Sequence, residues 1–226
     1  LLVEFSPAIA EWLNKRWAHR MLSGLTIGAV IFGITLSTLH QSGLGALFLM
    51  AKEKIHPLWY SEFIPLLFLV SSVFAGLAMV VFEGSISERV FADQISEKDK
   101  KARKGIVYSL ARISAFSMFI YFFLQVLVFI HGKRWVWLNT SMGYWYLLEM
   151  IGFVFVPILM FIRGYQKSSI LLIRAAAIFA IIGIVLNRLN VSIIAFRWDA
   201  AVGYTPSWME IVISLAIIFA EVWVFR

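Results

Sequence analysis

The chain has 226 residues, of which 61% are hydrophobic and 15% charged, and its mean hydropathy of +0.85 excludes a water-soluble domain of this size. Cysteine is absent, which excludes disulfides, cysteine nucleophiles and cysteine-bound iron–sulfur clusters. The net charge of +7 does not indicate nucleic-acid binding, because the Lys and Arg residues lie between apolar runs rather than along a groove with aromatic side chains.

Six apolar stretches are long enough to cross a membrane, which takes about 20 residues. In chain order they cover residues 21–39 or 21–50, 60–82, 105–130, 142–162, 170–190 and 208–225. We therefore predict an all-α integral membrane protein, an antiparallel bundle of about six transmembrane helices that forms one transmembrane domain over residues 1–226. The chain begins Leu-Leu-Val-Glu-Phe without an initiator methionine, so we interpret it as a fragment that starts after earlier spans.

Basic residues are distributed unequally between the two ends of the predicted helices. The more basic side carries Lys15, Arg16, Arg20, Arg89, Lys98, Lys100, Lys101, Arg103, Lys104, Arg163 and Lys167. The other side carries Lys52, Lys54, Lys133, Arg134 and Arg197. The positive-inside rule places the first side in the cytoplasm, so we expect a multi-pass protein of the cytoplasmic (inner) membrane with residues 40 and 41 near its outer face.

The first predicted span carries a histidine and a glutamine side by side, His40 and Gln41. A quinone head group needs a hydrogen-bond donor at each carbonyl oxygen and, for quinol oxidation, a base with a pKa near neutrality. His40 can act as that base and as one donor, and Gln41 can bind the second oxygen. Leu44, Leu47 and Phe48 would supply the apolar wall of the pocket. The alternative is a structural histidine satisfied at the membrane interface.

Other ionisable side chains lie inside the predicted spans, where insertion costs about 2.5 to 3.5 kcal/mol and each group needs a partner or a function. Near the outer face, Glu149, Arg188 and Glu210 could form an ion-pair network between three spans. A proton route or a docking point for a subunit are the alternatives for these three residues. Near the inner face, Glu83 and Arg112 on consecutive spans could form an ion pair or line a proton path.

Haem ligation is an alternative for His40, because His131 lies at a similar predicted depth on another span. The residues after His131 are Gly-Lys-Arg, which indicate that the chain is already leaving the membrane there. We therefore expect no haem and no metal ligands in this chain.

Several stretches of the sequence resemble the NrfD-type membrane subunits, in particular the branch that includes HybB and DsrP. They are residues 38–45 (TLHQSGLG), 56–60 (HPLWY), 65–69 (PLLFL), 186–191 (LNRLNV) and 204–211 (YTPSWMEI). The resemblance implies an all-helical subunit, often of ten spans and without haem, with a quinone site near the outer face. It implies electron exchange between menaquinone, or another quinone, and a periplasmic ferredoxin-like iron–sulfur subunit of a hydrogenase or sulfur-metabolism complex.

The resemblance also implies that the chain is not an enzyme alone, but the quinone-reactive subunit of a respiratory oxidoreductase complex. Of the family's quinone-site positions, only His40 with Gln41 can be placed here, because acidic partners on earlier spans have no counterpart. The outer loop that contains Arg197, Tyr204 and Trp208 is the expected docking surface for the redox partner.

A plain membrane anchor or an ion- or proton-translocating subunit without a quinone site is the competing interpretation. A transporter typically contains broken helices near the middle of the membrane. The predicted spans are interrupted by proline only at Pro65 and Pro157, and an anchor would not need the His40–Gln41 pair.

Overall fold

The computed structural model describes residues 16–90, 97–196, 198–199 and 206–224. Within these ranges the chain is helical, apart from loops and one isolated bridge between Ile55 and Phe196. The elements are α2 (Arg16–Leu49), α3 (Ile64–Val90), α4 (Glu97–His131), η2 (Arg134–Trp137), α5 (Ser141–Leu147), η3 (Leu148–Phe155), α6 (Val156–Gln166), α7 (Ile170–Leu189), η4 (Asn190–Ile194) and α8 (Trp208–Val224).

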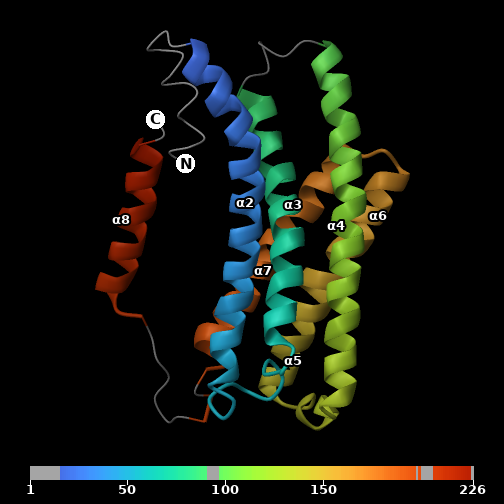
Figure 1. The fold of residues 1–226 in the computed structure, drawn as a ribbon. Helices are drawn as coiled ribbons and strands as arrows, with labels where there is room; N and C mark the ends of the chain where they lie inside the picture. The colour runs from blue at the N-terminus through green and yellow to red at the C-terminus, as the bar shows by residue number, and fades with distance from the viewer. Residues whose placement is uncertain (1–15, 91–96, 197, 200–205, 225–226) are drawn as a thin grey trace.

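The predicted all-α membrane architecture is confirmed by the length and hydropathy of these helices. Within the described ranges, five helical segments can cross a membrane: Leu25–Leu49, Ile64–Val90, Ala102–His131, Ser141–Gln166 and Ile170–Ile194. The sixth predicted span forms α8, whose apolar part, Trp208–Ala220, is shorter than the other five segments. In Figure 1, α8 stands apart from the remaining helices.

Helices α3, α4, α6 and α7 form a four-helix bundle in which α3 contacts α4 and α7, and α6 closes the ring by contacting α4 and α7. Helix α2 packs on α3 along the outside of this ring (Figure 1). Small residues at helix contacts allow close approach, which drives association in lipid, where no hydrophobic force acts between helices. The fully buried alanines of the bundle helices are Ala78, Ala111, Ala176, Ala177 and Ala180.

The fourth span is a single helix with a wider turn in its middle, since η3 is a π-helix between α5 and α6. Pro157 is the second residue of α6 and has no N–H group, so the ordinary helical hydrogen bond cannot form at this point. The π-helix is the local adjustment that accompanies this loss. At the start of the span, the Thr140 hydroxyl accepts a hydrogen bond from the Gly143 N–H (3.1 Å) and caps α5.

Candidate functional site

His40 and Gln41 lie on α2 inside its membrane-spanning part. The His40 side chain is exposed, and no hydrogen bond joins it to another described residue. Gln41 is half-buried. Adjacent helical residues point about 100° apart, which accounts for the difference between the two side chains.

The packing of α2 on α3 determines which way these side chains face. A Cβ atom on Gly45 would lie 2.9 Å from the Cα atom of Pro65, so only glycine permits this approach. Phe48 packs on the same side, with its ring centroid 5.9 Å from that of Phe68. Gln41 precedes Gly45 by one helical turn and therefore faces α3, whereas His40 does not.

The predicted quinone-binding residues consequently divide between two faces of α2. Gln41 and Phe48 lie toward α3, and His40 and Leu44 lie on the exposed side, where Leu44 is 37% exposed. The spacing of His40, Leu44 and Leu47 gives one continuous stripe, which we call the α2 stripe. An imidazole at the edge of an apolar stripe can form one wall of a site for an apolar molecule with polar oxygens.

A second polar site lies inside the four-helix bundle and is centred on Glu149, which is 4% exposed. Its Oε1 atom accepts a hydrogen bond from Asn187 Nδ2 (2.6 Å). Its Oε2 atom accepts hydrogen bonds from Trp59 Nε1 (2.8 Å) and Asn190 Nδ2 (2.5 Å). Three donors from the α2–α3 loop, α7 and η4 thus satisfy one buried carboxylate.

Two π-helices in the described part of the chain place this carboxylate and one of its donors. Glu149 lies in η3, and Asn190 begins η4. A Cβ atom on Gly183 would lie 2.7 Å from the backbone oxygen of Phe153, so α7 approaches η3 closely at this glycine. Because the helices are antiparallel, one turn beyond this contact brings Asn187 opposite Glu149.

The hydrogen bonds continue from Glu149 toward α3 through Asn187 and Arg188. Arg188 Nη1 donates to Asn187 Oδ1 (3.0 Å), and Arg188 Nη2 donates to Ser71 Oγ (2.7 Å). The guanidinium carbon also lies 3.5 Å from the ring centroid of Phe68, a cation–π contact. Glu149 and Arg188 are therefore joined through an amide rather than by a direct ion pair.

Two further hydrogen bonds extend the polar interior of the bundle. Trp145 Nε1 donates to Asn190 Oδ1 (2.8 Å), which fixes the orientation of that amide. On α4, Gln125 Nε2 donates to the Tyr121 hydroxyl (3.0 Å), and both side chains are buried. We refer to the residues that hydrogen bonds connect to Glu149, directly or through one another, as the Glu149 network: Trp59, Ser71, Trp145, Glu149, Asn187, Arg188 and Asn190.

The α2–α3 loop closes the end of the bundle at which α4 ends, around a buried histidine, His56, which is 1% exposed. Its Nδ1 atom accepts a hydrogen bond from the Leu58 N–H (3.2 Å). The rings of Trp59, Trp137 and Trp198 pack edge-on around it, with centroid distances of 5.7, 5.2 and 4.8 Å. Burial lowers the pKa of His56, so the imidazole is held in its neutral form.

Arg134 holds the same loop from the other side. Its Nη1 atom donates to the Leu58 carbonyl (2.9 Å), and its Nη2 atom donates to the Tyr60 carbonyl. The side chain is 7% exposed, and burial lowers the pKa of the guanidinium. Arg134 thus holds the loop against η2 as a clamp and is not a solvated surface charge.

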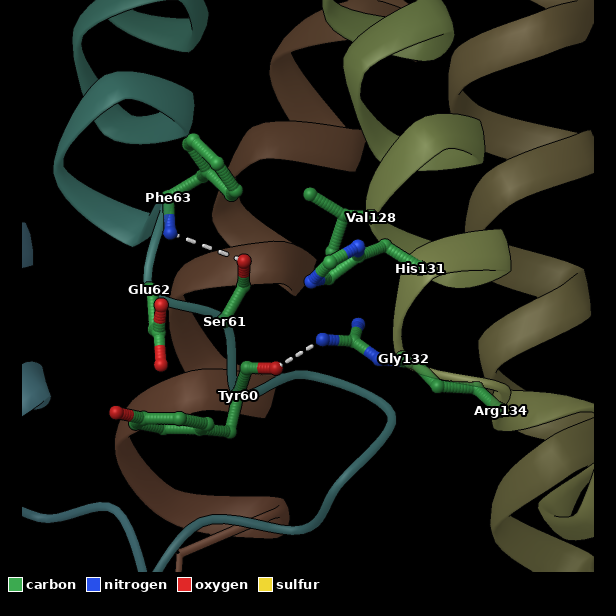
Figure 2. A pocket seen from close by; sticks show the side chains of 8 residues that line it. All are labelled: Tyr60, Ser61, Glu62, Phe63, Val128, His131, Gly132 and Arg134. Atoms are coloured by element: carbon green, nitrogen blue, oxygen red, sulfur yellow. Dashed lines mark hydrogen bonds between the residues drawn. The ribbon is translucent and has the colours of Figure 1, made fainter.

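A cavity of about 150 Å³ lies beside this clamp, between the α2–α3 loop and the end of α4. Figure 2 shows His131 and Ser61 on opposite sides of the cavity, with the Arg134 guanidinium beneath them. The Ser61 hydroxyl accepts a hydrogen bond from the Phe63 N–H (3.0 Å) and is therefore engaged in the turn that starts α3. His40 lies outside this cavity.

The remaining predicted site residues have different surroundings. Glu83 and Arg112 are both exposed, and the ion pair expected between them is absent from the described residues. The end of the bundle where α3 ends and α7 begins instead has an ion pair between Arg174 on α7 and Glu88 on α3. It forms because α7 packs against α3 in the ring, a contact that chain order does not reveal.

The predicted docking loop is described only in part. Arg197 and Tyr204 lie outside the described residues. Trp208, the first residue of α8, is 69% exposed. Glu210 is also exposed on α8, and the hydrogen bonds to Glu149 come from other residues.

Four residues that organise the polar interior and the end of the bundle at which α4 ends were not assigned to any site from the sequence: Trp59, Trp145, His56 and Arg134. Tryptophan near a membrane surface is usually explained by the aromatic belt. That explanation gives no reason to expect the indole N–H group to donate to a buried carboxylate or amide. Arg134 was counted only as a basic residue of the outer loops. One sequence signal could have indicated His56 and Trp59: both lie in a short aromatic loop segment, residues 56–60.

Comparisons with known proteins agree with this architecture. Residues 4–197 match the family described as "Polysulphide reductase, NrfD". Over 228 aligned residues, the chain is 42% identical to a protein of Nitratidesulfovibrio vulgaris (strain Hildenborough), covering 100% of this chain and 59% of the relative. It is 25% identical over 225 residues to the "Probable Ni/Fe-hydrogenase 2 b-type cytochrome subunit" of Escherichia coli K12, covering 98% of this chain and 56% of that protein.

No solved structure matches the chain. The chain spans somewhat more than half the length of these two relatives. The family match covers most of the sequence, including all five described membrane-spanning segments. This chain therefore belongs to the NrfD polysulphide reductase family.

Proposed function

We propose that this chain is part of a membrane subunit of a multi-subunit oxidoreductase, and that it exchanges electrons between menaquinone or menaquinol and a periplasmic iron–sulfur subunit. Membership of the NrfD family and the hydrogenase-subunit name of the Escherichia coli relative support a place in a redox complex. The observation that carries the quinone assignment is the exposed His40 imidazole beside Gln41 within the α2 span.

The α2 stripe fits a quinone head group on one side. The His40 imidazole, which has no hydrogen bond to a described residue, can hydrogen-bond to one head-group oxygen, and exposed Leu44 offers an apolar contact for the ring. Gln41 faces α3, so its amide reaches a second oxygen only from the α3 side of α2. The opposite wall of the site would come from further helices of the longer protein or from a partner subunit.

In quinol oxidation, two electrons pass to the iron–sulfur partner and two protons are released. We assign to His40 the acceptance of a proton from one head-group oxygen and its transfer to the outer aqueous phase; quinone reduction would use the reverse transfer. Gln41 orients the head group and exchanges no proton. The outer loop with Arg197, Tyr204 and Trp208 remains our proposed docking surface for the iron–sulfur subunit.

Replacement of His40 tests the assignment directly. In the intact complex, His40→Ala should lower quinone-linked turnover by about 10²- to 10⁴-fold, the usual contribution of a general acid–base group. Assembly should be unaffected, because the side chain is exposed and has no hydrogen bond to a described residue. His131→Ala is the matched control, since His131 is another exposed histidine of the same membrane side. Unchanged turnover in His40→Ala would refute the quinone assignment.

We propose no haem for this chain, although the Escherichia coli relative is named a b-type cytochrome subunit. His40 and His131 lie on α2 and α4, which pack separately on α3, and His56 is enclosed by tryptophan rings. An absorption spectrum and solvent extraction of the purified complex test this: bound menaquinone without haem bands agrees with the proposal. Haem bands that disappear in His40→Ala would contradict it.

The Glu149 network supports a second candidate function, proton transfer through the bundle. It connects an acidic side chain to Arg188 and Ser71 by hydrogen bonds inside membrane-spanning helices. Intramembrane carboxylates often mark such routes, but one with three donors is equally suited to holding helices together. Glu149→Gln distinguishes the roles in proteoliposomes: a lower proton-to-electron ratio at normal complex yield indicates a route, and an unchanged ratio indicates structure.

A further inference from the structure

The end of the bundle opposite Glu149 contains a cavity of about 180 Å³ between α3, α4 and α7. Three charged side chains form its polar part: Glu88, Arg103 and Arg174. Val80 and Ile106 form part of its apolar wall and are 53% and 58% exposed. The cavity is therefore polar at one end, and its apolar side lies next to exposed apolar surface of the helices.

The charges of this cavity do not cancel. Glu88 and Arg174 form an ion pair, which neutralises one arginine. Arg103 is exposed and has no hydrogen bond or ion pair with any residue in the described part of the chain. One positive charge is left for a ligand, and the sequence around it, 98–104, adds four further lysines.

The charged residues lie at the level where lipid head groups begin. Glu88 is two residues from the end of α3, and Arg103 is the second residue of the Ala102–His131 span. Arg174 is four residues from the start of α7. At about 1.5 Å per residue, all three lie within about 6 Å of the end of the apolar segment. This is the side on which the basic residues of the chain are concentrated.

We propose that this cavity is a binding site for an anionic phospholipid. Arg103 binds the phosphate group, and one acyl chain lies along Val80 and Ile106. Basic pockets between helices at this membrane level suit acidic head groups. A zwitterionic lipid carries the same phosphate together with its own cation, so the occupied site would keep one net positive charge. The site therefore favours a net negative head group.

Because the cavity contains the Glu88–Arg174 pair beside Arg103, removing a negative and removing a positive side chain should change lipid binding in opposite directions. Removing Arg103 takes away the uncompensated cation and should weaken binding. Removing Glu88 leaves Arg174 without its carboxylate and should strengthen binding, although both substitutions remove a charged residue. A purely structural role of these residues would instead make both variants less stable without opposite effects on lipid binding.

The experiment uses the full-length subunit, purified in detergent, stripped of lipid and analysed by native mass spectrometry with added lipid. The probes are dioleoyl phosphatidylglycerol and dioleoyl phosphatidylcholine, with inorganic phosphate as a competitor. Arg103→Gln should lower phosphatidylglycerol retention about fivefold, the effect of one basic residue near an acidic surface. Glu88→Gln should raise it.

Lys104→Gln is the matched control, because Lys104 is the next residue on α4, is exposed, and does not line the cavity. It should change phosphatidylglycerol retention much less than Arg103→Gln. Equal losses in the two variants would mean unspecific surface attraction and would overturn the proposal. Equal retention of the two lipids by the wild type, or full displacement by inorganic phosphate, would overturn it as well. Arg103→Lys, which keeps the charge, should retain most of the binding.

Discussion

Glu149 and His40 are both ionisable side chains in membrane-spanning helices, but their surroundings differ. Glu149 is buried among three hydrogen-bond donors from three elements, so residues of this chain donate hydrogen bonds to both of its carboxylate oxygens. His40 is exposed on α2, and no described residue hydrogen-bonds to it. A polar group whose hydrogen-bond partners all lie in its own fold indicates a structural role. A polar group without such partners indicates that a ligand or another subunit provides them.

The same contrast holds for the helices that carry the two residues. Helices α3, α4, α6 and α7 enclose the Glu149 network in a closed ring, whereas α2 contacts this ring along one face only. Substitutions inside the ring should therefore affect stability first, and substitutions on the α2 stripe should affect function first.

The largest stability effect is expected at the centre of the network. Glu149→Ala should lower the free energy of unfolding by about 3 to 5 kcal/mol, because the charge that compensates Arg188 is lost and three donors lose their acceptor. Thermal unfolding of the full-length protein in detergent measures this effect. His40→Ala should change stability by less than about 0.5 kcal/mol. Similar losses in the two variants would remove the distinction between the two regions.

The Arg134 clamp on the α2–α3 loop should have the next largest effect. Arg134→Ala leaves the carbonyls of Leu58 and Tyr60 without their donor, at a cost of about 1 to 3 kcal/mol. Faster proteolysis of the α2–α3 loop would reveal the loss. Lys133→Gly is the matched control: it removes a neighbouring charge, and glycine suits the φ of 48° at this position. Equal proteolysis rates for Arg134→Ala and the control would contradict the clamp.

An effect of similar size is expected where α2 meets α3. At Gly45, the added methyl group of Gly45→Ala collides with the backbone of Pro65, and overpacking costs about 1 to 3 kcal/mol. Gly43→Ala places the same methyl group where nothing lies within 4 Å, so it should be neutral or slightly stabilising. Thermal unfolding compares the two variants. If Gly45→Ala is as stable as Gly43→Ala, α2 does not pack on α3 at this distance.

The smallest effect concerns pH and His56. Burial lowers the pKa of this histidine, so the detached loop binds a proton more readily than the packed loop does. Loop packing should be complete above the ordinary histidine pKa of about 6.5 and weaken as the pH falls below it. Hydrogen exchange of residues 51–63 at several pH values measures the change. In His56→Phe this pH dependence should disappear, and its persistence would assign it to another group.

The sequence predicted the helices well because membrane spans depend on local hydropathy. Residues 105–130 lie within α4, and residues 170–190 coincide with α7 and the first residue of η4. The π-helices were not predicted, because they depend on Pro157 and on the contact of Phe153 with Gly183, which lies 30 residues away. No local pattern encodes that contact.

The candidate sites were predicted less completely. Glu149 and Arg188 were recognised because a charged residue in an apolar run needs a partner, but the sequence could not show that Asn187 joins them. It also indicated Glu83 and Arg112 as partners, whereas Glu88 and Arg174 pair. Residue spacing gives depth along a helix but does not give the rotation of one helix against another, and rotation determines which charges meet.

The sequence by itself determined that this chain crosses a membrane repeatedly, where its helices lie and which polar groups they carry into the lipid, since each of these follows from local composition. Only the tertiary structure decided that Glu149 is enclosed by donors, that Arg134 clamps a loop, and that His40 is left exposed. These outcomes depend on which helices become neighbours and how closely small residues such as Gly45 and Gly183 let them approach. They are therefore properties of the packed helices and not of any one of them.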